Sequence, residues 1–137
     1  MKNLLLTIAM LLCSITVFSQ WTISTDGRVD YEFNSEVEDF VRVEDSYQNV
    51  VTFFEINDDQ TYMKHTTPTA VSIYMLNIAK VSKEDEPAAI HYNAISDNGY
   101  EYYILLNLGH DEIKFLYDWE DDVIMTVFFI KNRWHQK

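Results

Sequence analysis

Cysteine, proline and glycine are scarce in this sequence: 137 residues include one Cys, two Pro and three Gly. A single cysteine excludes a fold held together by intramolecular disulfide bonds. Scarce glycine and proline exclude collagen-like and other low-complexity chains. Hydrophobic residues nevertheless make up 47% of the chain, so it can bury a core, and its length suits one domain.

Positive charge is scarce as well. The chain carries 10 Lys and Arg against 22 Asp and Glu, which gives a formal net charge of −12. Proteins that bind nucleic acid need a basic face to neutralise the phosphates, and anionic lipid attracts the same kind of face. We therefore expect neither nucleic acid nor an anionic membrane surface among the partners.

The first 19 residues have the pattern of a secretory signal peptide. Lys2 supplies a positive start, residues 4–17 are mostly apolar, and Val17 and Ser19 are at the positions that signal peptidase reads. The apolar run is shorter than the ~20 residues of a membrane-spanning helix. We expect a signal peptide at 1–19 and an exported domain at 20–137, either periplasmic or extracellular. Cleavage would remove the only cysteine, Cys13, and change the net charge to −13.

The remaining sequence has the composition of an all-β domain. Turn signals such as Asn57-Asp58-Asp59 recur at short intervals, and the segments between them are rich in Val, Ile, Thr, Tyr and Phe. We predict about eight to nine antiparallel strands, with at most one short helix, in a single up-and-down barrel or a two-sheet sandwich. The barrel is favoured because closure hides the sheet edges.

Alternation within the segments predicts which face of each strand is buried. Residues 28–33 place Val29 and Tyr31 on one face and Asp30 and Glu32 on the other, so we expect the apolar pair in the core. By the same pattern, Phe54 and Ile56 point inward from one strand, Met63 and His65 point inward from the next, and Ile113, Phe115 and Tyr117 point inward from a later one.

Two segments need separate treatment. In residues 34–45, Ser35 and Glu38 form a capping-box pattern that favours a helix, whereas Val41 and Val43 alternate with charged residues as in a strand. We favour the strand. Asp97-Asn98-Gly99 predicts a tight hairpin turn of type I′, which requires a positive φ at its central residues.

No catalytic, metal or cofactor site is evident in the sequence. It has no Gly-x-Ser-x-Gly motif, and the four histidines lack the spacing of metal ligands. Glu55 and Glu101 are the only acids in markedly apolar surroundings. A hydrolase that uses a pair of carboxylates is therefore the enzymatic alternative.

The aromatic residues, 15% of the chain, indicate a ligand-binding interior. A barrel lined by aromatic side chains and a few polar groups could hold a small apolar ligand. The candidate ligand-binding residues are His65, Tyr74, Tyr92 and Tyr117. The opposing possibility is that such side chains fill a small barrel completely.

The strand expected at residues 123–131 is apolar on both faces. Either both faces are covered within the chain, or one face meets a protein partner or a second copy. Taken together, these patterns predict an exported, acidic, non-enzymatic β-domain that binds a small apolar ligand or an envelope protein. The alternatives are the carboxylate-dependent hydrolase and a structural component of the envelope.

Overall fold

The structure is a computed structural model that describes residues 20–84 and 87–136. Within these residues the chain forms nine β-strands and one short 3-10 helix. The elements are β1 (Gln20–Asn34), β2 (Asp39–Arg42), β3 (Thr52–Asn57), β4 (Tyr62–Thr66), β5 (Val71–Ser82), β6 (Ala89–Ser96), β7 (Glu101–Asn107), η1 (Leu108–His110), β8 (Glu112–Trp119) and β9 (Asp122–Gln136).

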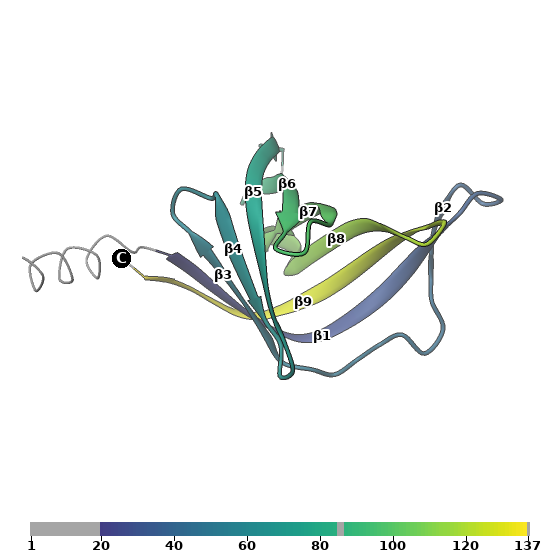
Figure 1. Ribbon diagram of the computed structural model, residues 1–137, viewed down its shortest axis with the longest axis horizontal. Helices are drawn as coiled ribbons and strands as arrows, with labels where there is room; N and C mark the ends of the chain where they lie inside the picture. The colour runs from purple at the N-terminus through teal and green to yellow at the C-terminus, as the bar shows by residue number, and fades with distance from the viewer. Residues whose placement is uncertain (1–19, 85–86, 137) are drawn as a thin grey trace, which may run out of the picture.

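Eight of the strands close into an antiparallel barrel (Figure 1). β1 pairs with β3, each strand from β3 to β9 pairs with the next, and β9 returns to β1. β2 pairs only with the last residues of β1 and lies outside the ring. The prediction of an all-β, up-and-down barrel is confirmed, and the two-sheet sandwich is not the architecture.

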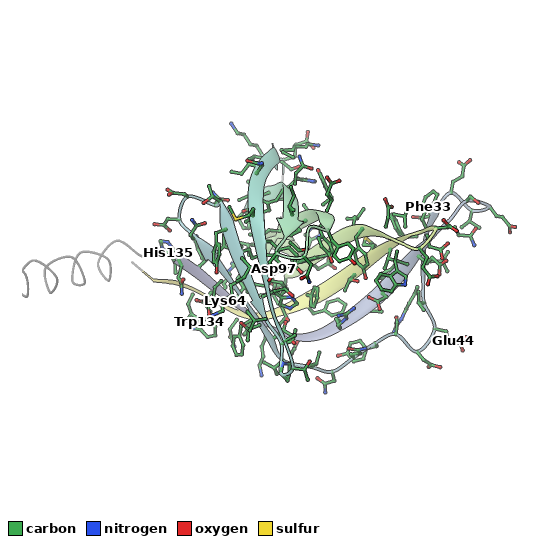
Figure 2. The ribbon with its side chains drawn as sticks, viewed as in Figure 1. Phe33, Glu44, Lys64, Asp97, Trp134 and His135 are labelled. Atoms are coloured by element: carbon green, nitrogen blue, oxygen red, sulfur yellow. The ribbon has the colours of Figure 1, made fainter. Side chains whose placement is uncertain are left out.

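The long strands β1 and β9 extend beyond the ring towards β2 (Figure 1). Figure 2 shows Phe33 at this far tip, whereas Trp134 and His135 lie near the opposite end of the same two strands. From β2, residues 43–51 run back beside β1, and Gln48 exchanges two backbone hydrogen bonds with Arg28. This connection therefore takes the place of a neighbouring strand along the middle of β1.

The core is a cluster of apolar side chains that point into the ring from all eight strands that form it. Its members include Ile23, Phe54, Ile56, Met63, Tyr74, Leu76, Tyr92, Ile104, Leu106, Ile113, Phe115 and Phe128. The faces predicted for the segments around Phe54, Met63 and Phe115 are thus confirmed. Their strands follow a regular alternation because both neighbours pair with them without a bulge.

The face predicted for the second half of β1 is wrong. Arg28 and Asp30 face the barrel interior, while Val29 and Tyr31 point outward. The pairing of β1 with β9 shifts between Thr25 and Gly27, and a shift of one residue exchanges the two faces of a strand.

The outward face of this part of β1 is covered within the chain. Val29 is only 2% exposed, and an added Cβ at Gly27 would lie 2.7 Å from the Tyr47 hydroxyl oxygen. Tyr47 belongs to the connection 43–51, so this segment packs over the outer side of β1. The apolar outer face therefore needs no second sheet to bury it.

Residues 34–45 contain no helix. β1 continues to Asn34, a turn follows in which Glu38 has a φ of 55°, and β2 runs antiparallel to β1. The Asn34 side chain accepts hydrogen bonds from the amides of Glu36 and Val37, so it closes the turn. The strand prediction is confirmed here.

The hairpin between β6 and β7 differs from its predicted type. Gly99 has a φ of 86°, but Asn98 does not have a positive φ, so the turn is not type I′. The amide of Gly99 donates to the Ser96 carbonyl, and the amide of Ser96 donates to the Tyr100 carbonyl. This is the three-residue hairpin loop, in which one glycine at positive φ restores the strand pairing.

The apolar strand at 123–131 is partly explained by burial within the chain. Thr126 and Phe128 point into the barrel, and the outward Val127 is buried opposite Val29 of β1. An interaction with a partner through residues 123–131 stays a prediction. Among the residues that the structure describes, no helix has the length and hydrophobicity needed to cross a membrane.

Candidate ligand-binding site

A cavity of about 660 Å³ opens at the end of the barrel that carries the β4–β5 and β8–β9 turns. The second half of β1 and the connection 43–51 form one side, and β4, β5, β7, β8, β9 and the β4–β5 turn form the remainder. The lining residues are Arg28, Asp30, Glu32, Val43, His65, Thr67, Ser72, Tyr74, Tyr102, Phe115, Tyr117, Trp119, Asp122, Ile124, Thr126 and Phe128.

Aromatic rings form the base of this cavity. His65 stacks on Phe54 with ring centroids 4.0 Å apart and planes only 7° from parallel. The ring of Phe128 meets the His65 ring edge-on, with centroids 5.2 Å apart. The centroids of Phe115 and Phe128 are 5.5 Å apart. The base is therefore aromatic and continuous with the core.

Three tyrosines form the wall that rises from this base. The Tyr102 ring meets the Tyr74 ring edge-on and also contacts the Tyr117 ring. Its centroid lies 5.4 Å from the centroid of each of these rings. Burial raises the pKa of Tyr74 to about 12, and the neighbouring Tyr102 adds to this effect. The Tyr74 phenol is thus neutral at ordinary pH. Above the tyrosines, Trp119 lies at the rim with 63% of its surface exposed.

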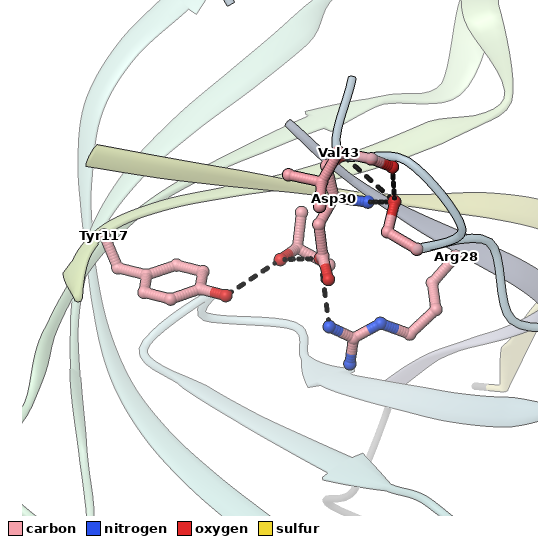
Figure 3. Close-up of polar contacts among 6 residues, drawn as sticks. Arg28, Asp30, Val43 and Tyr117 are labelled. Carbon is pink, nitrogen blue, oxygen red and sulfur yellow. Dashed lines mark hydrogen bonds and ion pairs between the residues drawn. The ribbon is translucent and has the colours of Figure 1, made fainter. Parts of the chain in front are cut away.

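A chain of polar groups connects β8, β9 and β1 along the lining of the cavity (Figure 3). The Thr126 hydroxyl donates to Asp30 Oδ1 over 2.7 Å and accepts from the Tyr117 hydroxyl at 3.0 Å. Arg28 Nη2 donates to the same Asp30 oxygen at 3.1 Å. The Asp30 carbonyl accepts from the Val43 amide, so the connection 43–51 holds this part of β1 in place.

Two buried nitrogens of the lining have no partner among the described residues: Arg28 Nε and His65 Nε2. His65 is only 7% exposed. Burial, and secondarily the charge of Arg28, lower the pKa of His65 to about 4. The ring is therefore neutral near pH 7. The guanidinium of Arg28 also lies over the Phe128 ring, 5.4 Å from its centroid.

The structure brings together three of the four residues predicted from sequence. His65, Tyr74 and Tyr117 line the cavity. Tyr92 lies elsewhere in the core, and its hydroxyl donates to Gln60 Oε1 over 2.6 Å, in the β3–β4 turn at the other end of the barrel. A ligand-binding role for these residues stays a prediction.

Sequence reasoning missed the polar side of the cavity, which consists of Arg28, Asp30 and Thr126. The prediction that Val29 and Tyr31 lie in the core implies that the charged residues of β1 face solvent. The available signal was that charged residues alternate with apolar ones here, a pattern that is equally compatible with a polar interior. Only the bulge at Thr25–Gly27 decides between the two.

The two acids named as catalytic candidates lie outside this cavity, as does His91. Glu55 and Glu101 are on the outer faces of β3 and β7, on strands that do not pair with each other. His91 lies between Ser82 and Tyr103, at 3.2 and 2.8 Å, on the outside of the barrel. Across residues 20–84 and 87–136, no three His, Cys, Asp or Glu side chains form a group that could hold a metal ion.

Comparisons with models of protein families, with curated proteins and with solved structures find no match to this chain. The function must therefore be inferred from the geometry of the cavity itself.

Proposed function

We propose that this protein is a non-enzymatic binding domain that holds a small, mainly apolar ligand in the open end of its barrel. The supporting observation is the cavity of about 660 Å³, lined by closely packed aromatic rings together with polar and charged side chains. Ligand sites in proteins typically have volumes of about 300–1,000 Å³ and the same mixture of an apolar lining with a few placed polar groups.

The polar groups of the cavity suit binding better than catalysis. Asp30 Oδ1 already accepts two hydrogen bonds, so it is engaged as a structural acceptor. His65 is neutral, and its buried Nε2 has no hydrogen-bond partner among the described residues, as the nitrogen of a base that activates a nucleophile would have. These side chains therefore supply shape and hydrogen bonds to a ligand.

The proposal includes export of the domain, on the strength of the signal-peptide pattern of residues 1–19. An exported barrel with an aromatic cavity can carry or sequester a molecule that is poorly soluble in water. Its strongly negative charge keeps such a carrier soluble.

Titration with naphthalene, followed by two-dimensional NMR of the full chain, tests the proposal. We expect resonances of cavity residues to shift. Ser72→Trp fills the cavity, and should weaken naphthalene binding by at least about tenfold, since overfilled sites exclude their ligands. The matched control Met75→Trp places the same ring on the outer face three residues away and should leave binding unchanged. Shifts outside the cavity, or equal binding by both variants, would contradict the proposal.

A further inference from the structure

The wall of the cavity formed by β1, β9 and β8 places a column of charged residues opposite a column of aromatic ones. On β1 every second residue of the lining is charged, and on β8 every second residue is aromatic, while β9 lies between them and pairs with both. The columns are Arg28, Asp30 and Glu32 on β1 and Phe115, Tyr117 and Trp119 on β8. Since two strand spacings separate them, the columns are about 10 Å apart.

At the mouth of the cavity, this arrangement brings carboxylates close to aromatic rings. The strand register places Glu32 opposite Ile124 and Ile124 opposite Tyr117, so all three lie in one row. In the next row outward, Asp122 is the direct partner of Trp119. The side chains of Trp119 and Asp122 are exposed, and all of these residues line the cavity. A group that enters the mouth therefore meets carboxylates and aromatic rings together.

The two carboxylates at the mouth have no cationic partner. Among the residues that the structure describes, no Lys, Arg or His side chain forms an ion pair with Glu32 or Asp122. Arg28 is four residues deeper than Glu32, about 13 Å along the strand. Its charge is already matched by Asp30 (Figure 3). The mouth therefore has an excess of negative charge, on a chain whose net charge is −12.

An organic cation suits this mouth better than other groups. The faces of Trp and Tyr rings attract an ammonium group, and neighbouring carboxylates add a direct charge attraction. An anionic group would be repelled by the same carboxylates, and a neutral group would gain no charge attraction from them. A metal ion would need a group of at least three ligands, which the described residues do not form.

We propose, building on the proposed function, that the ligand is an organic cation, in which one ammonium group is attached to an apolar, ring-bearing body. The ammonium group lies at the mouth, between the carboxylates of Glu32 and Asp122 and the rings of Tyr117 and Trp119. The apolar body extends inward along Phe115 to the aromatic base of the cavity. The carboxylates of the mouth select against ligands that carry a negative charge.

Four probes with one skeleton test this inference on the full chain at pH 7: naphthalene, 2-naphthylmethanol, 2-naphthylmethylammonium and 2-naphthoate. Dissociation constants are measured by NMR titration. We expect the ammonium probe to bind about tenfold tighter than the alcohol, because it alone gains from the rings and the carboxylates of the mouth. 2-Naphthoate should bind more weakly than the alcohol. Added salt should reduce the preference for the ammonium probe, since it screens charges at an exposed site.

A pair of double variants separates the charge of the mouth from the charge of the whole protein. Glu32→Gln with Asp122→Asn removes both carboxylates with little change in shape. The preference for the ammonium probe over the alcohol should fall at least about threefold, while naphthalene binding is retained. The control, Glu55→Gln with Asp59→Asn, removes the same two charges on the outer face of β3 and in the β3–β4 turn, outside the cavity. It should keep the preference.

A second pair of variants tests the aromatic ring at the rim. Trp119→Leu removes the ring but keeps an apolar side chain, so the preference for the ammonium probe should fall by about threefold. Trp134→Leu makes the same change at an exposed position near the other end of β9, outside the cavity, and should keep the preference.

The outcomes separate the two proposals. If no probe shifts cavity resonances, the proposed function is wrong. If naphthalene binds in the cavity but the ammonium probe binds no tighter than the alcohol, or 2-naphthoate binds as tightly as the ammonium probe, the binding function is supported and the cationic ligand is overturned. The assignment to the mouth is overturned if the variant without Glu32 and Asp122 keeps the full preference, or if its control loses as much. Full preference in Trp119→Leu would remove that ring from the site.

Discussion

The Thr126 hydroxyl donates a hydrogen bond of 2.7 Å to Asp30, although 96 positions separate the two residues in the sequence. They are direct partners in the register of β1 and β9, where the barrel closes. Both side chains point inward, so the closure of the ring and the polar side of the cavity depend on the same pair.

Replacing Thr126 tests how much this pair contributes. Thr126→Val keeps the shape but removes the hydroxyl, leaving Asp30 and Tyr117 each without one hydrogen bond at a position that is 2% exposed. We expect a loss of about 1–3 kcal/mol in the free energy of unfolding, measured from the denaturant midpoint. Thr126→Ser keeps the hydroxyl, so its free energy of unfolding should fall less than that of Thr126→Val. Equal loss in both variants would assign the effect to packing instead.

The turn between β6 and β7 gives a second prediction. Gly99 has a φ of 86°, and a Cβ built there meets no atom within 4 Å, so any cost of substitution comes from the backbone alone. Gly99→Ala should lower the free energy of unfolding by roughly 1–2 kcal/mol, because a Cβ is unfavourable at positive φ. Gly99→Asn should cost less, since asparagine tolerates this region. A denaturant midpoint unchanged by alanine would contradict this account.

The strands and the closed ring could be predicted from the sequence because alternation and turn signals are local. Phe54, Met63 and Phe115 sit in strands without bulges, where a period of two residues is enough to place each side chain. His65 follows from the same pattern, which is how one residue at the base of the cavity could be named in advance.

The polar half of the cavity could not be predicted in this way. The bulge beside Gly27 exchanges the faces of β1, and the connection 43–51 buries Val29 from outside, so both features depend on contacts between distant segments. Similarly, the sequence places Tyr92 on the inner face of its strand but does not say at which end of the barrel its hydroxyl lies. Here it bonds to Gln60 at the end opposite the cavity.

The position of Tyr92 leads to a prediction that separates it from the cavity residues. Tyr92→Phe removes the hydrogen bond to Gln60 and should cost about 1 kcal/mol of stability. It should leave the affinity for naphthalene unchanged, because neither residue lines the cavity. NMR titration and a denaturant melt of the same sample measure both quantities. Weaker naphthalene binding in this variant would show that the ligand reaches the other end of the barrel.

Acid should destabilise the protein through His65. Burial and Arg28 lower the folded-state pKa of His65 to about 4, whereas the unfolded chain has the usual value near 6.5. Between these values the unfolded state binds the proton and the folded state does not. The free energy of unfolding therefore falls as the pH drops from about 6.5 to about 4, by roughly 2–4 kcal/mol from this group.

The variant His65→Phe isolates this contribution, because its ring can still stack on Phe54 but carries no titrating group. Carboxylates titrate in both proteins, so they largely cancel in the difference between the two free energies of unfolding. As the pH falls from about 6.5 to about 4, the variant should become more stable relative to the wild-type protein. Above pH 7 the difference should be constant. Denaturant melts at intervals of half a pH unit measure it. A difference that stays constant down to pH 4 would mean that His65 is protonated in the folded protein, and that the base of the cavity carries a second positive charge.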